Sequence, residues 1–120
     1  MTCILRVSGP GIETVVSRVA LKPLRTSADG AHFDVSNAGF DNFMAQVDDA
    51  IAFLRVHATD LKLLFGVPGI SGVLDFAIEW RGVAAQFGTF PAALVREAGS
   101  LGFALEVSHY PRSVASEGEA

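Results

Sequence analysis

The sequence is poor in cysteine and has no long apolar run. Cys3 is the only cysteine among 120 residues, which excludes an internal disulfide and fits a reducing cytoplasm. No apolar run approaches the roughly 18 residues of a membrane-spanning helix. Arg6 and the segment Gly9-Pro10-Gly11 interrupt the N-terminal residues, so a secretory signal is not expected either. These absences predict a cytoplasmic protein without a membrane partner.

Positive charge is also scarce. Nine Lys and Arg residues stand against 13 Asp and Glu residues, which gives a net charge of −4. Lys22 and Arg25 are scattered rather than clustered, and nucleic-acid binding depends on basic clusters that neutralise phosphates. We therefore expect no nucleic-acid partner.

Apolar residues, by contrast, make up 50% of the chain and charged residues only 18%, so the body of the chain is not expected to be disordered. A chain of 120 residues is long enough to bury a core in one domain. We predict a single domain over residues 1–111. The small, mostly polar residues 112–120 are expected to form a flexible tail.

The C-terminal part of the chain joins a helical pattern to a strand pattern. The helical stripe consists of Phe90, Leu94, Ala98 and Leu101. Gly102 stands where a left-handed residue commonly ends a helix. The apolar side of the strand that follows consists of Phe103, Leu105 and Val107. A helix and a strand joined this closely bury both apolar faces in a two-layer arrangement.

The rest of the chain shows the same two periodicities. Strands are predicted over residues 2–8, 31–36, 73–81 and 83–87, and helices over 10–19, 40–55 and 59–64. The stripe of the longest helix is Phe40, Phe43, Met44, Val47, Ile51 and Leu54. Gly82 predicts a tight hairpin that pairs 83–87 antiparallel with 73–81, and residues 21–31 form a loop.

This order of elements predicts an α+β fold. Leu74, Phe76, Ile78 and Trp80 alternate with polar or small residues along one strand, so one apolar sheet face must meet the helix stripes. The expected architecture is a two-layer sandwich of the ferredoxin-like type. Its mixed or antiparallel sheet has about five strands, with the helices packed on one face.

Two parts of the sequence resemble an uncharacterised family of small bacterial domains of unknown function. The first is Phe90-Pro91 with its helical stripe and the closing strand to Tyr110, and the second is Pro23 in the loop with Asp29-Gly30 before a strand. The resemblance covers nearly the whole chain and implies a ferredoxin-like fold. It implies no catalytic residues, because none is established for that family.

The motifs that invite a catalytic or cofactor-binding interpretation are incomplete. Gly9 and Gly11 match two glycines of a dinucleotide fingerprint, but Thr14 stands at the third, so a plain turn is the better interpretation. Asp75 and Glu79 lie roughly 13 Å apart along one strand, too far to flank one bond. No cofactor is predicted.

The histidines and the cysteine show no metal or triad spacing. His32, His57 and His109 lie on separate predicted elements, and Cys3 has the strand parity of a core residue. Ser108 and His109 are strand neighbours that face opposite ways. We therefore predict neither a metal site nor catalytic residues.

The polar face of the predicted sheet is the strongest candidate surface. Its candidate interaction residues are Arg6, His32, Asp34, Asp75, Glu79, Arg81 and Glu106. Mixed charges interspersed with small apolar residues such as Ile4, Val73 and Ala77 suit a homodimer or a protein partner better than a pocket. The alternative is that this face only meets water.

The predicted function is therefore a non-enzymatic binding or interaction domain that self-associates or binds a protein partner. Toxin-neutralising immunity proteins offer one analogy for such a domain. The alternative is a small-ligand sensor or a minor enzyme with a pocket between helices and sheet. Such a pocket would be lined by Trp80, His109 or Tyr110.

Overall fold

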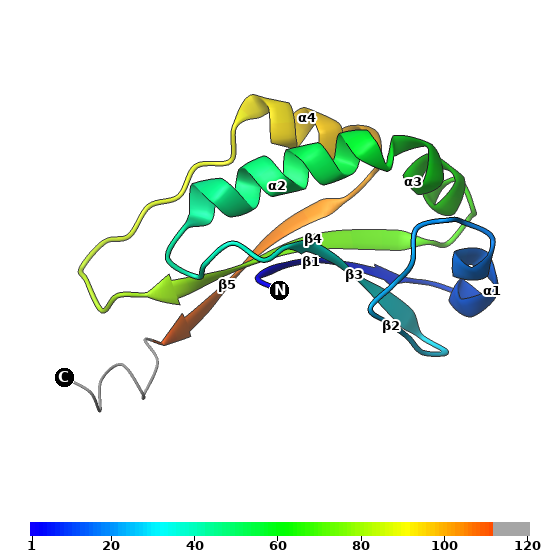
Figure 1. Ribbon diagram of the computed structural model, residues 1–120, viewed down its shortest axis with the longest axis horizontal. Helices are drawn as coiled ribbons and strands as arrows, with labels where there is room; N and C mark the ends of the chain where they lie inside the picture. Colours follow the sequence, from blue (N-terminus) through cyan, green and yellow to red (C-terminus); the bar gives the residue numbers. More distant parts are fainter. Residues whose placement is uncertain (112–120) are drawn as a thin grey trace.

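Five strands form one mixed sheet in the order β2-β3-β1-β4-β5 (Figure 1). The strands are β1 (Cys3–Ser8), β2 (Arg25–Thr26), β3 (Gly30–Ser36), β4 (Ser71–Trp80) and β5 (Ala104–Pro111). The computed structural model describes residues 1–111, so the predicted tail lies outside the described residues. β1 pairs antiparallel with β3 and β4, and β5 pairs parallel with β4. The α+β class is confirmed, but this strand order does not confirm the ferredoxin-like topology.

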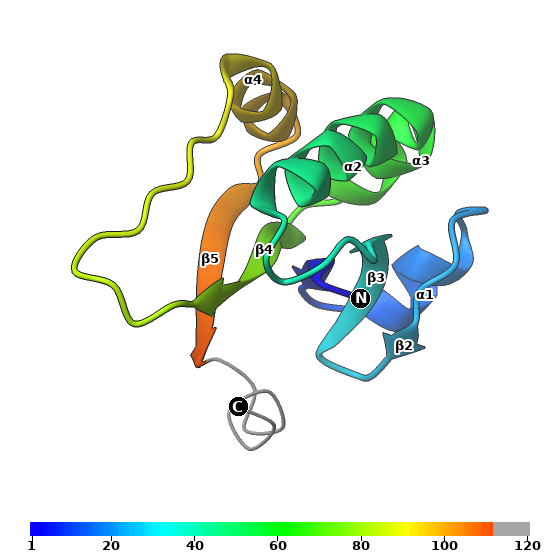
Figure 2. The same ribbon diagram turned by 60° about the vertical axis from the view of Figure 1, so that its left-hand side comes forward.

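Four helices accompany the sheet. They are α1 (Ile12–Ser17), α2 (Phe43–Val56), α3 (Ala58–Phe65) and α4 (Ala92–Ser100). Figures 1 and 2 show α2 and α4 over one face of the sheet and α1 at the end where β1 stops. None of the described helices crosses the opposite face, which we call the open face.

The core lies on the helix side of the sheet, and all four helices contribute buried residues to it. Strand register places Phe33, Leu5 and Leu74 side by side in one row, and all three are fully buried. Val47 of α2 and Leu94 of α4 are also fully buried in this cluster. The predicted alternation along β1 and β4 is therefore confirmed. Trp80 is the exception: it is 39% exposed at the last position of β4.

The buried side of α2 differs from the predicted stripe. Its buried residues are Gln46, Val47, Ala50, Phe53 and Leu54, whereas Phe40 and Met44 are exposed. The helix begins only at Phe43, because the Asn42 side chain accepts a hydrogen bond from the Ala45 N–H and caps it. Gln46 is buried because its Nε2 donates to the carbonyl oxygens of Gly39, at 3.1 Å, and Ala77, at 2.7 Å.

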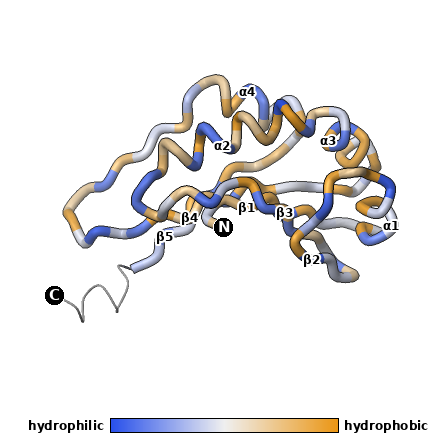
Figure 3. The backbone as a smooth tube through the Cα atoms, viewed as in Figure 1, coloured by the Kyte–Doolittle hydropathy of each residue, from blue (hydrophilic) through white to orange (hydrophobic). Residues whose placement is uncertain are grey.

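The predicted hairpin after β4 is wrong. Residues 81–91, which we call the arch, form no strand and swing away from the sheet toward α4 (Figures 1 and 2). Both sides of β4 are already occupied, by β1 on one side and β5 on the other, so a hairpin strand has no place. Several hydrophilic residues mark the arch in Figure 3, although Phe87 within it is 92% exposed.

Gly9 turns the chain between β1 and α1 in a conformation reserved for glycine. Its φ is +149°, and a Cβ there would lie 2.5 Å from the Gly69 carbonyl oxygen. We expect Gly9→Ala to lower the free energy of unfolding by about 2–4 kcal/mol, from backbone strain and steric overlap. Urea denaturation measures this loss.

Gly99 provides the matched control within α4. A Cβ at Gly99 meets no atom within 4 Å, so we expect Gly99→Ala to stabilise the protein by no more than about 1 kcal/mol. Equal stability of the two variants would contradict the close approach of Gly69 to Gly9.

Candidate functional site

The open face carries side chains from the four long strands. They are Ile4 and Arg6 of β1, His32 and Asp34 of β3, Val73, Asp75, Ala77 and Glu79 of β4, and Glu106, Ser108 and Tyr110 of β5. Six of the seven predicted interaction residues lie on this face. Arg81 does not, because β4 ends at Trp80 and Arg81 instead lines a hollow with Asp41 and Phe87 beside the start of α2.

An ion-pair cluster occupies the middle of the open face. Arg6 Nη1 lies 2.9 Å from Asp75 Oδ2, and Arg6 Nη2 lies 2.7 Å from Glu106 Oε2. Ser108 Oγ donates to the other Asp75 oxygen at 2.7 Å. Asp75 is only 7% exposed, yet both of its oxygens have partners. Both carboxylate oxygens of Asp75 are therefore engaged in contacts that tie β4 to β1 and β5.

Sequence reasoning identified Arg6, Asp75 and Glu106 but not their pairing. Arg6 and Glu106 are 100 positions apart, and only the β1–β4–β5 order brings them together. In the sequence, Asp75 shares a strand face with Glu79, which lies four residues further along. Asp34 lies in the same row as Asp75, on the far side of Ile4, and accepts a hydrogen bond from Asn37 Nδ2 at 3.1 Å.

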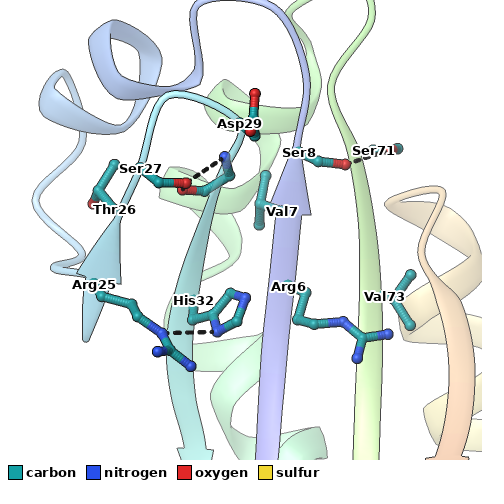
Figure 4. A pocket seen from close by; sticks show the side chains of 11 residues that line it. Arg6, Val7, Ser8, Arg25, Thr26, Ser27, Asp29, His32, Ser71 and Val73 are labelled. Carbon is teal, nitrogen blue, oxygen red and sulfur yellow. Dashed lines mark hydrogen bonds between the residues drawn. The ribbon is translucent and has the colours of Figure 1, made fainter.

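A groove of about 510 Å³ opens at the β2 end of the face (Figure 4). Arg25, His32 and Arg6 lie side by side along it, on three neighbouring strands. Arg25 Nε donates to His32 Nδ1 at 3.3 Å. Burial lowers the pKa of His32 below its ordinary value of 6.5, and the charges of Arg25 and Arg6 lower it further. Arg25 was missed because β2 is only two residues long and lies in the predicted loop.

The other end of the open face is apolar. The aromatic patch consists of Met1, Ile4, Phe40, Ala77 and Tyr110, which line a hollow of about 330 Å³ together with Thr2 and Asp75. The rings of Phe40 and Tyr110 meet edge to face, with centroids 6.2 Å apart. Phe40 is 49% exposed and Tyr110 50% exposed.

Backbone pairing carries Phe40 to this face. The Ala77 N–H donates to the Thr2 carbonyl at 2.8 Å, and the Glu79 N–H donates to the Phe40 carbonyl at 2.9 Å. The residues before α2 therefore extend the line of β1 along β4. Periodicity does not reveal this position, because the spacing of Phe40 also fits the stripe of α2.

The three residues expected to line a ligand pocket do not converge. Trp80 and His109 meet edge to face at 6.2 Å, and their strand parity places both on the helix side of the sheet. Tyr110 belongs to the opposite, open face. Within residues 1–111 no group of three or more His, Cys, Asp and Glu side chains is arranged to hold a metal ion.

Cys3 is fully buried under the helices. Burial raises the pKa of its thiol far above the usual range, and the nearby carboxylates of Asp75, Asp34 and Asp49 raise it further. The thiol therefore stays protonated and packs as a small apolar side chain. No helix in the described part of the chain is long and apolar enough to cross a membrane.

Comparison of the chain with protein-family models, with curated protein sequences and with solved structures finds no match. The resemblance to a bacterial domain family therefore stays a prediction.

Within residues 1–111, removing Arg6 would leave the Asp75 carboxylate with Ser108 as its only side-chain partner. We expect Arg6→Met to lower the free energy of unfolding by about 1–3 kcal/mol, the cost of leaving a buried charged acceptor underpaired. The control is Arg55→Met, which removes the exposed ion pair of Arg55 with Glu97 and should cost less than about 1 kcal/mol. If urea denaturation showed similar losses of unfolding free energy for the two variants, the ion-pair cluster would stabilise the protein no more than an exposed ion pair does.

Proposed function

We propose that this chain is a non-enzymatic protein-interaction domain that self-associates through its open face. The observation that carries the proposal is the aromatic patch beside the ion-pair cluster, on a sheet face that no described helix covers. The single, buried cysteine suits the reducing cytoplasm expected from the sequence.

The composition of the open face favours a protein partner. Aromatic residues, methionine and arginine are enriched in the centres of protein interfaces, and Met1, Phe40, Tyr110 and Arg6 bring all three kinds together. Arg6 already has two carboxylate partners within its own chain. Covering the cluster with a partner therefore buries charges that are paired in advance, which reduces the cost of desolvation.

A second copy of the chain is the partner that we propose for this face. Sheets pack face to face about 10 Å apart through side chains of moderate size, and the aromatic patch offers such side chains. A two-fold axis through the patch lets Phe40 and Tyr110 of one copy meet the same residues of the other. Homodimers use the same patch on both subunits in this way.

Ala77 provides a test because it lies within the aromatic patch and points away from the core. We expect Ala77→Arg to reduce the self-association measured by light scattering after size-exclusion chromatography, because a long charged side chain would enter the interface. Ala52→Arg on the exposed side of α2 makes the same chemical change and should leave the mass unchanged. Equal behaviour of the two variants would count against this face.

Binding of a small anion in the groove is a second candidate function. Arg25 and His32 line the groove, and Arg25 Nε bonds only to His32 within the described residues. Burial is the main cause of the lowered pKa of His32, and the positive charges of Arg25 and Arg6 lower it further. An anion between Arg25 and His32 would offset this charge repulsion. This site lies on the open face rather than between the helices and the sheet.

The titration of His32 tests this second candidate. In the free protein we expect its pKa, measured by NMR, to lie below 6.5. The neutral ring is then the form that folding favours, so its contribution to stability is present above pH 6.5 and declines as the pH falls through the lowered pKa. Anion binding predicts that inorganic phosphate raises this pKa in the native protein and not in Arg25→Gln. An unchanged pKa at millimolar phosphate would leave the groove without this role.

A further inference from the structure

The two edges of the sheet are protected very differently. The β2 edge is two residues long and includes a charged residue, Arg25. The β5 edge is eight residues long and pairs with β4 without any shift in register. Short strands, charges and bulges are the usual protection of a sheet edge. Between Ala104 and Tyr110 the edge strand carries one residue of fixed charge, Glu106.

The hydrogen bonds of β4 show which backbone groups of β5 point outward. The N–H groups of Ala77 and Glu79 bond toward the β1 side, so the odd-numbered residues of β4 face β1 and the even-numbered ones face β5. Leu74 pairs with Leu105 in the parallel ladder. In a parallel ladder, a residue whose backbone groups face the neighbouring strand bonds to the residues before and after the one opposite it. Leu74 therefore bonds to Ala104 and Glu106, the two neighbours of Leu105.

The odd-numbered residues of β5 therefore direct their backbone groups away from the sheet. Leu105, Val107 and His109 each present an N–H and a carbonyl, and Pro111 presents a carbonyl alone because proline has no N–H. No hydrogen bond within residues 1–111 reaches these three N–H groups. The side chains of Leu105 and Val107 are only half-buried beneath the helices.

We propose that β5 pairs antiparallel with β5 of a second copy of the chain, with the two-fold axis passing between the two Val107 residues. The interface uses the backbone edge of β5; it shares Tyr110 with the open-face contact proposed above but does not depend on that contact. It joins two five-stranded sheets into one continuous sheet whose open faces lie on the same side.

The register of the β5–β5 pairing follows from the positions of the outward N–H groups and of the Glu106 carboxylate. Centring on Val107 pairs Val107 with itself and Leu105 with His109 of the other copy, so all three outward N–H groups find carbonyls. Centring on Glu106 places two carboxylates opposite each other, which is destabilising. Centring on Ser108 sets Leu105 against Pro111, which has no N–H to donate.

The favoured register also suits the side chains. Glu106 lies opposite Ser108 of the other copy, so that no two carboxylates face each other, and Ala104 lies opposite Tyr110. On the helix side the half-buried Val107 and Leu105 gain apolar and aromatic neighbours across the interface. The strand is thus complementary to itself, which favours a second copy over an unrelated strand.

Cysteine cross-linking reads this register directly. Residues opposite each other in a hydrogen-bonded antiparallel pair have Cα atoms about 5.5 Å apart, within the reach of a disulfide. We expect Val107→Cys to form a disulfide-linked dimer under mild oxidation. Leu105→Cys is the matched control, because the two copies of residue 105 are offset by roughly 13 Å along the strands. The native Cys3 is buried and does not interfere.

The cross-linking result decides between the registers. Efficient linkage of Val107→Cys with little linkage of Leu105→Cys supports the proposal. Equal linkage of both variants, or linkage of Ser108→Cys in place of Val107→Cys, overturns it. A native protein that stays monomeric in light scattering while Val107→Cys fails to link overturns it as well.

A proline variant tests the same edge by mass. Val107→Pro removes an outward N–H and leaves the ladder to β4 intact, as edge positions tolerate. If both interfaces form, the native assembly is a tetramer, and either Val107→Pro or Ala77→Arg halves its mass. Adding Ala77→Arg to the Val107→Cys variant should leave the disulfide linkage unchanged. Failure of the open-face proposal and failure of the edge proposal therefore give different results. Loss of the linkage in Ala77→Arg would assign the association to the open face alone.

Discussion

The antiparallel pairing of β1 with β4 is the contact on which the other features of the molecule depend. It places Leu5 beside Leu74 on the helix side of the sheet and Arg6 beside Val73 on the open face. The same line of hydrogen bonds continues past the start of β1, where β4 bonds to Thr2 and then to Phe40. One side of β4 is thereby filled along most of its length, and β5 fills the other.

The hydrogen bonds of β4 explain both the arch and the aromatic patch. Because no side of β4 is left for a hairpin, the chain leaves the sheet at Arg81 and returns to it only through α4 and β5. Because Phe40 is held against Glu79 by its carbonyl, its ring lies on the open face beside Tyr110 rather than under α2. The buried Gln46 strengthens this link by bonding to Gly39 and Ala77.

Buried side chains are stabilised differently on the two faces of the sheet. On the helix side, apolar side chains fill the space beneath α2 and α4, and even the cysteine there is kept protonated by burial. On the open face, the nearly buried Asp75 is held by Arg6 and Ser108. The paired charges of the Arg6 cluster and the exposed rings of Phe40 and Tyr110 are the features of this face that support the proposed protein contact.

Periodicity alone was enough to identify β1, β3, the inner side of β4 and the stripe of α4. In each of these, alternating or helical spacing follows directly from which side chains must avoid water. The buried side of α2 was less predictable, because Gln46 is buried for its hydrogen bonds and Met44 is exposed, against their hydropathy. Residues on the open face could be named from strand parity, but their partners could not.

The sequence by itself determined that this chain forms an α+β fold with one apolar and one polar sheet face, because side-chain hydropathy has a period that each element must obey. The tertiary structure alone decided the strand order, the parallel pairing of β5, the arch and the meeting of Arg6 with Asp75 and Glu106. These features depend on pairings between residues far apart in the chain, which compete for the same backbone hydrogen bonds. Local periodicity does not show which of these competing pairings forms.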